Sequence, residues 1–224
     1  LAEKCFERRE DYGKGVEVPD GVLVLTCGVD TQDQRLEYEV VGWGWDEESW
    51  GIQRGIIVGR TDEDEVWNEL DAVLDREWRR RDGKALRIAV TFVDSGGHRT
   101  QEVYKQCKKR ERKHVYPIKG EDGQGRQYCY LSKTKTKENL FIIGVDAGKE
   151  AIQFAASVTE PGPRYCHWPS NPERGYDKDY FAGLFSEKPV IHTRKGRSVI
   201  VWEKVTSARN EPLLRTAPRI RLPP

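Results

Sequence analysis

Two aspartates in the sequence each end a run of apolar and β-branched residues. Asp30 closes the segment VLVLTCGVD at residues 22–30, and Asp94 lies in IAVTFVDSGG at residues 88–97. A carboxylate at the end of a buried strand points into a cleft, so two such strands side by side would offer a divalent cation a pair of oxygen ligands. The alternative for each residue is a turn-starting aspartate that bonds its own backbone.

Such a pair could hydrolyse a phosphodiester. Two cations about 4 Å apart stabilise the charge on the phosphorus oxygens and on the leaving oxygen, and they activate the attacking water. Mg²⁺ binds through a few hard carboxylates and keeps several waters, so two or three Asp or Glu residues suffice. We therefore expect Asp30 to bridge two metal ions and Asp94 to bind one of them.

Three further polar residues are weaker candidates for the same site. Asp146 ends the segment FIIGVD and Lys149 follows at i+3, so they could orient water or contact a phosphate. A structural ion pair or a helix N-cap is the competing interpretation for both. His98 follows Gly96-Gly97 and is a candidate proton shuttle, while the glycine turn could present backbone N–H groups to a phosphate.

The helices and strands that must position these residues are predicted from the turn-forming residues and from the spacing of apolar residues. Residues 22–30, 35–42 and 49–58 read as an antiparallel meander, because they are β-rich and short turns separate them. Residues 62–81 carry apolar side chains at i, i+3 and i+4, which predicts an amphipathic helix. The remaining expected elements are a strand ending at Asp94, a helix at 99–112, strands at 115–119, 127–132 and 139–145, and a helix at 147–156. This order predicts an α/β fold with a mixed central sheet, three antiparallel strands first and parallel strands after them, flanked by helices.

Composition limits the function classes. The chain has 224 residues, 37% hydrophobic and 33% charged, which suits one globular domain with a real core. It contains no run of roughly 18 apolar residues, so membrane insertion is not expected. The absence of Met indicates a piece of a longer or processed polypeptide, and the five cysteines, without a CxxC pair, indicate free thiols in a reducing compartment. No GxxxxGK[ST] motif is present, so nucleotide hydrolysis is not expected of this chain.

The charge pattern favours a polyanionic partner. Net charge is only +1, but several basic runs concentrate positive charge locally, and the local sign governs phosphate contact. The alternative for each run is a solvated helix face or loop. The residues expected to bind DNA are Lys105, Lys108, Lys109, Arg110, Lys133, Lys135 and Lys137.

Several motifs in a fixed order carry a family resemblance. An Asp on the first strand and another on the first strand after the helix is the pattern of the ribonuclease H-like superfamily. The segments GVDTQDQRLEYEVVGWGWDEESW, VDSGGHRTQEVYKQC, YPIKG, GVDAGKE, HWP and ARNE resemble the nuclease domain of the large terminase subunit of tailed bacteriophages, the GpA family. The resemblance runs from about residue 15 to residue 211.

This resemblance implies a domain that cuts concatemeric viral DNA during genome packaging in the host cell cytoplasm. It implies two Mg²⁺ ions, with Mn²⁺ as a substitute, and double-stranded DNA as substrate. The implied partners are an N-terminal ATPase domain in the parent chain, a small terminase subunit and a portal. The implied organisation is a linker at residues 1–20 from the missing ATPase domain, a ribonuclease H-like nuclease domain at 21–211, and an atypical Pro/Arg-rich tail at 212–224.

The third carboxylate departs from the family pattern. GpA-type chains usually continue RNE with Ala, Leu and an Asp on a C-terminal helix, and that Asp completes the metal site. Here Leu214 stands at the expected position, and the prolines that follow cannot extend a helix. A truncated or frame-shifted terminus would explain this tail. Glu211, one helical turn earlier, is the substitute ligand.

Three hypotheses stay open at this point. The first is a metal-dependent endodeoxyribonuclease, and the second is a catalytically incomplete DNA-binding or assembly module of the packaging motor with the same fold. The third is a resolvase or transposase-like enzyme that performs strand transfer. A third carboxylate within about 5 Å of the aspartate pair separates the first two, because metal ligation requires oxygens at about 2.1 Å.

Overall fold

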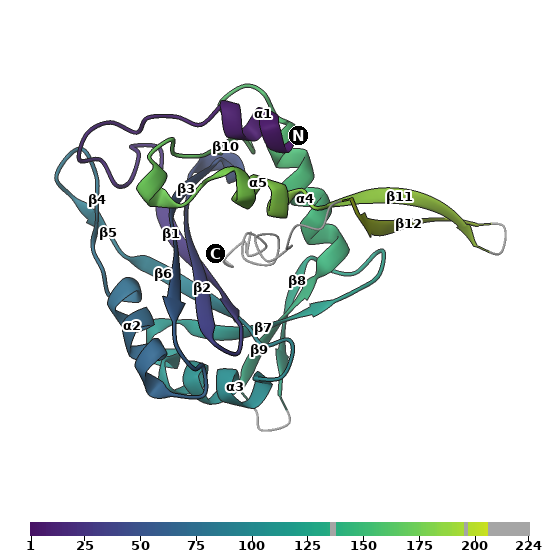
Figure 1. Cartoon of the computed structure of the whole chain (residues 1–224), viewed down its shortest axis with the longest axis horizontal. Helices are drawn as coiled ribbons and strands as arrows, with labels where there is room; N and C mark the ends of the chain where they lie inside the picture. Colours follow the sequence, from purple (N-terminus) through teal and green to yellow (C-terminus); the bar gives the residue numbers. More distant parts are fainter. Residues whose placement is uncertain (135–137, 195–196, 206–224) are drawn as a thin grey trace.

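The first three strands form an antiparallel meander, as their alternating pattern predicts. In the computed structural model, which describes residues 1–134, 138–194 and 197–205, these strands are β1 (Val24–Thr31), β2 (Arg35–Trp43) and β3 (Ser49–Val58). The pairing places β2 between the other two (Figure 1). Short polar turns join the strands, so each strand reverses direction and pairs with its predecessor.

The second half of the sheet is mostly parallel. Strand β6 (Ile88–Asp94) pairs with β1, and it is followed across the sheet by β7 (Val115–Glu121) and β9 (Asn139–Gly144), all in the same direction. Edge strand β8 (Cys129–Lys133) is antiparallel to β9, and short β10 (Cys166–His167) runs parallel to β3. The resulting eight-stranded sheet has the order β10-β3-β2-β1-β6-β7-β9-β8. The predicted mixed sheet is therefore confirmed.

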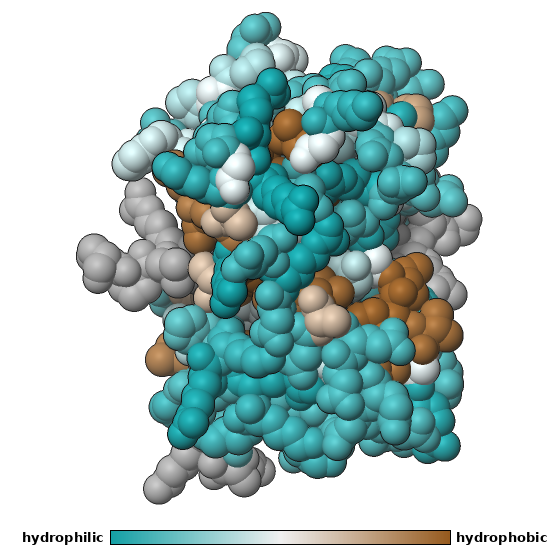
Figure 2. Space-filling model, turned by 90° about the vertical axis from the view of Figure 1, so that its left-hand side faces the viewer, coloured by the Kyte–Doolittle hydropathy of each residue, from teal (hydrophilic) through white to brown (hydrophobic). Residues whose placement is uncertain are grey.

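One face of the sheet is covered by two helices, α2 (Asp64–Leu74) and α3 (Thr100–Lys109). Their apolar residues pack against side chains of β1, β2, β3 and β6 in a single cluster that includes the fully buried Trp67 and Leu70. Burial of the apolar side chains on this face makes the largest contribution to the stability of the fold. The side of the molecule that carries α2 is mostly hydrophilic on its outer surface, with hydrophobic residues in separate patches (Figure 2).

Among the described residues, helices cover the opposite face at one end. Helices α4 (Val145–Ser157) and α5 (Lys178–Leu184) pack there with α1 (Ala2–Glu7) in a second cluster. The Tyr180 hydroxyl of α5 donates to Glu39 of β2 at 2.9 Å, which fixes this helix over the sheet. A third cluster, around Phe92 and Ile118, lies on β6, β7 and β9.

The helix predicted at residues 62–81 is shorter than expected. It ends at Leu74, and Trp78 lies instead in β4 (Trp78–Arg79), which pairs with β5 (Ala85–Leu86). The carbonyl of Arg79 accepts from the backbone N–H groups of Glu17 and Val18. The N-terminal segment thus forms hydrogen bonds with backbone that a longer helix would use for itself. Trp78 is buried, as its apolar character predicts, but it lies on a strand and not on a helix.

The N-terminal segment, interpreted from sequence as a linker over residues 1–20, is packed onto the domain. Cys5 and Val18 are fully buried, and α1 contacts α5. Outside the main sheet, β11 (Glu187–Arg194) and β12 (Arg197–Lys204) form a projecting hairpin (Figure 1). Three short 3-10 turns complete the described elements, η1 (Trp45–Glu47), η2 (Glu111–Lys113) and η3 (Pro172–Arg174).

All five cysteines are free thiols, as the sequence predicts. Among the helices of the described residues, none combines the length and apolar character needed to cross a membrane.

Candidate metal and nuclease site

The strand register brings Asp30 and Asp94 side by side. Val29 of β1 is paired with Val93 of β6 in a parallel ladder, so the next residue on each strand is an aspartate. Val29 and Val93 face the α2 and α3 layer. Because side chains alternate along a strand, both carboxylates point to the other face, beyond the end covered by α5.

Different donors hold the two carboxylates. Asp30 is 3% exposed, and its Oδ2 accepts from the Gln32 side-chain amide at 2.6 Å. Asp94 is half-buried, and its Oδ1 accepts from the backbone N–H of Gly96 at 2.9 Å. Burial raises the pKa of the Asp94 carboxyl, although the N–H groups of Gly96 and Ser95 act in the opposite direction. A bound cation would offset this cost of burying negative charge.

A third carboxylate that the sequence analysis missed lies across from Asp30. Glu37 of β2 is the cross-strand partner of Asp30, is 7% exposed, and accepts from Arg35 Nε at 2.8 Å. The alternation in RLEYEVVG was the signal, since it places Glu37 on the same face as the buried Glu39. Even so, no group of three His, Cys, Asp or Glu side chains that could hold a metal is present among the described residues. Glu211 lies outside the described residues.

The loop after Asp94 is tied down at several points. The Ser95 hydroxyl donates to the carbonyl of Ile118 at 2.7 Å, and Thr100 Oγ1 donates to the carbonyl of Ser95 at 2.7 Å. Arg99 reaches from this loop to Asp33, in the turn that follows Asp30, at 3.0 Å. The two loops that follow the aspartates are therefore linked directly. His98 is exposed on this loop.

Asp146 and Lys149 lie apart from the pair. They sit in the first turns of α4, which follows β9, and β9 is two strands from β6, a spacing of roughly 10 Å. Lys149 forms an ion pair with Glu187 of β11 at 2.5 Å, and its Nζ lies 5.5 Å from the ring centroid of Trp202. This arrangement favours the structural ion pair that the sequence left open for Lys149.

The basic residues of α3 have carboxylate partners. Lys105 pairs with Glu102 at 3.2 Å, Lys108 with Glu111 at 2.9 Å, and Lys109 with Asp64 at 2.8 Å. These lysines are exposed enough to exchange partners with a phosphate. Lys133 donates to Asn139 across the β8–β9 hairpin. Lys135 and Lys137 lie outside the described residues.

Arg110 is different from these lysines. Its side chain is 8% exposed and pairs with Asp71 of α2 at 2.8 Å. Its guanidinium also lies 5.7 Å from the ring centroid of Trp67. The arginine therefore joins α3 to α2, and the geometry favours a structural role over the DNA contact expected from sequence.

Lys119 is a basic residue near the pair that the sequence analysis quoted in YPIKG but did not assign. Asp94 is paired with Ile118 in the β6–β7 ladder, and Lys119 is the next residue of β7. Its side chain is exposed. It therefore lies at the edge of the sheet where the strands of the two aspartates end, but its side chain points to the opposite face, because Ile118 shares the face of Asp94.

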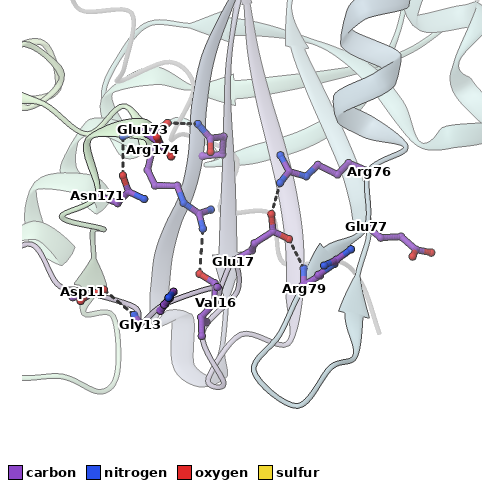
Figure 3. A pocket seen from close by; sticks show the side chains of 13 residues that line it. Asp11, Gly13, Val16, Glu17, Arg76, Glu77, Arg79, Asn171, Glu173 and Arg174 are labelled. Carbon is purple, nitrogen blue, oxygen red and sulfur yellow. Dashed lines mark hydrogen bonds and ion pairs between the residues drawn. The ribbon is translucent and has the colours of Figure 1, made fainter.

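A cleft of about 830 Å³ lies elsewhere on the surface (Figure 3). It is lined by residues of the N-terminal segment, of the α2–β4 region and of η3, and neither Asp30 nor Asp94 lines it. Glu17 pairs with Arg76 across it and also accepts from the backbone N–H of Arg79 at 2.8 Å. Arg174 donates to the carbonyls of Ile52 and Val16. These contacts hold the N-terminal segment in place.

Comparison with known proteins gives a consistent result. A family model described as the terminase large subunit gpA endonuclease domain matches residues 2–215. The terminase large subunit of Escherichia phage lambda is 35% identical over 218 residues, which is 95% of this chain and 33% of that protein. The terminase large subunit of Enterobacteria phage P21 is 31% identical over 204 residues, which is 88% of this chain and 31% of that protein. The chain thus spans about a third of the length of these relatives.

A solved structure supports the fold. A mutant nuclease domain of the large terminase subunit gp2 of bacterial virus Sf6, with manganese, aligns with a TM-score of 0.50 and 13% identity, over 88% of this chain and 85% of that one. At this identity the likeness concerns the fold alone. The prediction of a ribonuclease H-like sheet is confirmed at that level.

Proposed function

The chain belongs to the family of terminase large subunit gpA endonuclease domains, and we propose that it cuts double-stranded DNA by metal-dependent hydrolysis during viral genome packaging. The observation that carries this proposal is the juxtaposition of Asp30 and Asp94 at the ends of adjacent parallel strands. Two hard carboxylates on one face suit Mg²⁺ or Mn²⁺, which prefer oxygen ligands.

Asp30 and Asp94 supply two of the oxygen ligands that a divalent metal site needs. Bound cations would stabilise charge on the phosphate oxygens and activate a water. In our proposal Asp30 and Asp94 hold two cations, and Glu211 is the third ligand. Burial of Asp30 and the raised pKa of Asp94 make the pair an unfavourable place for uncompensated negative charge.

Residues outside the pair have supporting roles in this proposal. Lys119 is proposed as a contact to a phosphate of the substrate that passes over this edge of the sheet, because it is exposed on β7, the strand next to the one that carries Asp94. Further contacts to DNA phosphates are proposed for Lys105, Lys108, Lys109 and Lys133. His98 is proposed as a proton carrier, since it is exposed on the loop that follows Asp94.

The wider setting follows from the family and concerns a protein longer than this chain. We propose that an N-terminal ATPase domain, a small terminase subunit and a portal act with this domain in the host cell cytoplasm. The relatives that the chain matches are about three times as long.

The second candidate function is a catalytically incomplete DNA-binding or assembly module with the same fold. It is favoured by Leu214 at the position where the family carries its third carboxylate. In that case the aspartates would be retained without cleavage, and DNA affinity would persist without metal.

Nicking of supercoiled plasmid separates the two functions. The chain is incubated in Mg²⁺, in Mn²⁺ and in EDTA, together with the variants Asp30→Asn and Asp94→Asn. We expect metal-dependent nicking that both variants lose. Activity in EDTA would contradict the metal mechanism, and DNA binding with no nicking in either metal would favour the assembly module.

A further inference from the structure

The turn after Asp30 carries a side chain aimed back at that carboxylate. Gln32 Nε2 donates to Asp30 Oδ2 at 2.6 Å. A carboxylate can only accept, so this contact assigns the amide nitrogen as the donor. A hydrogen bond to one carboxylate oxygen sets the plane of the group, and it thereby sets the direction in which the group offers its oxygens to a cation.

The backbone of Gln32 is held from both sides. Its N–H donates to the carbonyl of Arg35 at 3.0 Å, which closes the β1–β2 turn. Its carbonyl accepts from the hydroxyl of Thr61 at 2.6 Å. The Thr61 side chain lies on the segment between β3 and α2, so two separate parts of the chain meet at this turn.

Thr61 is itself anchored in the core. It is fully buried, and its carbonyl accepts from the indole Nε1 of Trp67 at 3.0 Å. Trp67 is also fully buried, on the inner side of α2. A chain of contacts therefore runs from the helix layer through Thr61 and Gln32 to Asp30, and the backbone from which the Gln32 side chain extends has a rigid support.

Asp94 has no equivalent side chain among the contacts described. The donor to its Oδ1 is a backbone N–H, that of Gly96. Mutation cannot remove that donor without changing the loop. Gln32 is therefore a point at which the orientation of Asp30 can be altered by changing one side chain.

We propose that Gln32 is a positioning residue for Asp30, that Thr61 holds it in place, and that both set the affinity of the site for its divalent cations. This inference rests on the proposed function, because Gln32 acts only through Asp30. Loss of an outer hydrogen-bond partner of a metal-binding group typically costs about 10–100-fold in metal affinity.

The test measures binding of Mn²⁺ alone to the purified chain, by isothermal titration calorimetry and by electron paramagnetic resonance of the free ion. The variants are Gln32→Ala, Asp30→Asn, and Gln34→Ala as the matched control, since Gln34 is an exposed glutamine in the same turn. Thr61→Val removes the hydroxyl at similar volume, and Thr61→Ser restores it. Thermal unfolding of each variant shows whether it is folded at the temperature of the titration.

We expect Gln32→Ala to weaken Mn²⁺ binding about 10-fold, with Gln34→Ala unchanged and Thr61→Ser closer to the parent than Thr61→Val. A general loss of stability would lower the melting temperature but would leave the Mn²⁺ affinity of the folded fraction unchanged. Parent-like Mn²⁺ affinity in Gln32→Ala, with affinity lost in Asp30→Asn, would overturn the role of Gln32 and leave the proposed function standing. Parent-like affinity in Asp30→Asn would overturn both.

Discussion

Asp30 and Asp94 end neighbouring strands, yet their surroundings give them different sensitivities to substitution. Asp30 is almost fully buried and fixed by a side-chain amide, whereas Asp94 is half-buried and held by a backbone N–H. An asparagine at position 30 would keep the size of the side chain and remove the charge. Substitution there therefore tests the chemistry more directly than it tests packing.

We predict that Asp30→Asn abolishes plasmid nicking in Mn²⁺ while leaving the melting temperature close to that of the parent. The loss should exceed the about 10–100-fold cost of removing an outer partner of a metal ligand. Asp122→Asn is the matched control, because Asp122 is exposed. Equal nicking by the parent and by Asp30→Asn would exclude Asp30 from the site.

A second titratable residue, His167, lies on β10 at the edge of the sheet away from the aspartate pair. His167 is 8% exposed, stacks on Trp50 with ring centroids 4.7 Å apart, and bonds Glu10 at 2.8 Å and Glu48 at 2.9 Å. Burial disfavours the charged ring, but the hydrogen bonds to Glu10 and Glu48 outweigh it and raise the pKa of His167. The folded state thus binds this proton more tightly than the unfolded chain does.

We therefore predict that His167 stabilises the fold most at acid pH. Its contribution is complete below the unfolded pKa of about 6.5 and is lost as the pH rises through the folded-state pKa. Urea unfolding of the parent and of His167→Gln, from about pH 5.5 to about pH 8.5, should give a difference in free energy that shrinks with rising pH. A difference that is constant over this range would contradict the raised pKa.

At the level of elements, the contact between α2 and α3 distinguishes structural from exposed basic residues. Arg110 and Asp71 pair with side chains that are 8% and 25% exposed. Lys113 also contacts Asp71, at 3.2 Å. Removing Arg110 would leave a partly buried carboxylate with one remaining partner.

We predict that Arg110→Ala lowers the free energy of unfolding by about 2 kcal/mol, less than the 3–5 kcal/mol of a fully buried pair because Lys113 stays. Lys108→Ala, at an exposed site two residues earlier in α3, should cost less than about 0.5 kcal/mol. Chemical denaturation measures both. Equal effects would mean that Arg110 is no more structural than its neighbour.

The exposed lysines call for a different measurement. We predict that Lys108→Ala with Lys109→Ala reduces the slope of log K against log salt for DNA binding by up to about 1.8, and Lys119→Ala by about 0.9. The loss should show little dependence on DNA sequence, because phosphate contacts carry no base information. An unchanged slope for the double variant would assign Lys108 and Lys109 to a solvated helix face held by their own carboxylate partners.

At the level of the whole molecule, the aspartate pair lies on the face of the sheet that α4 and α5 cover at the other end. In our proposal, a third oxygen ligand would approach the pair from that side. The family resemblance implies that a C-terminal helix supplies it, and this chain has Leu214 where that helix carries an Asp.

We predict feeble nicking by this chain in Mg²⁺ and somewhat better nicking in Mn²⁺. Replacing the residues after Glu211 with Ala-Leu-Asp and a helical continuation should raise the rate in both metals, because it returns one hard ligand to the site. Plasmid nicking by the parent and repaired chains measures this. If the repaired chain is no faster and Glu211→Gln removes the residual activity, then Glu211 already serves as the third ligand.

Local sequence was sufficient for the strands that end in Asp30 and Asp94 and for the mixed sheet. Apolar runs, alternation and turn residues act over a few neighbouring positions, so they can be interpreted without knowing the partners. The same signals overextended the helix at 62–81. The apolar periodicity continues to Trp78, but the backbone carbonyl of Arg79 accepts hydrogen bonds from the distant N-terminal segment.

Contacts between distant residues were decided by the tertiary structure. The register places Glu37 opposite Asp30, Asp71 pairs with Arg110, and Thr61 holds the turn of Gln32. No spacing rule connects such partners, because each pair depends on how separate elements pack. The sequence by itself therefore determined the strand ends, the mixed sheet and the family, while packing of the sheet and helices decided which side chains surround the aspartate pair and which connect the helices.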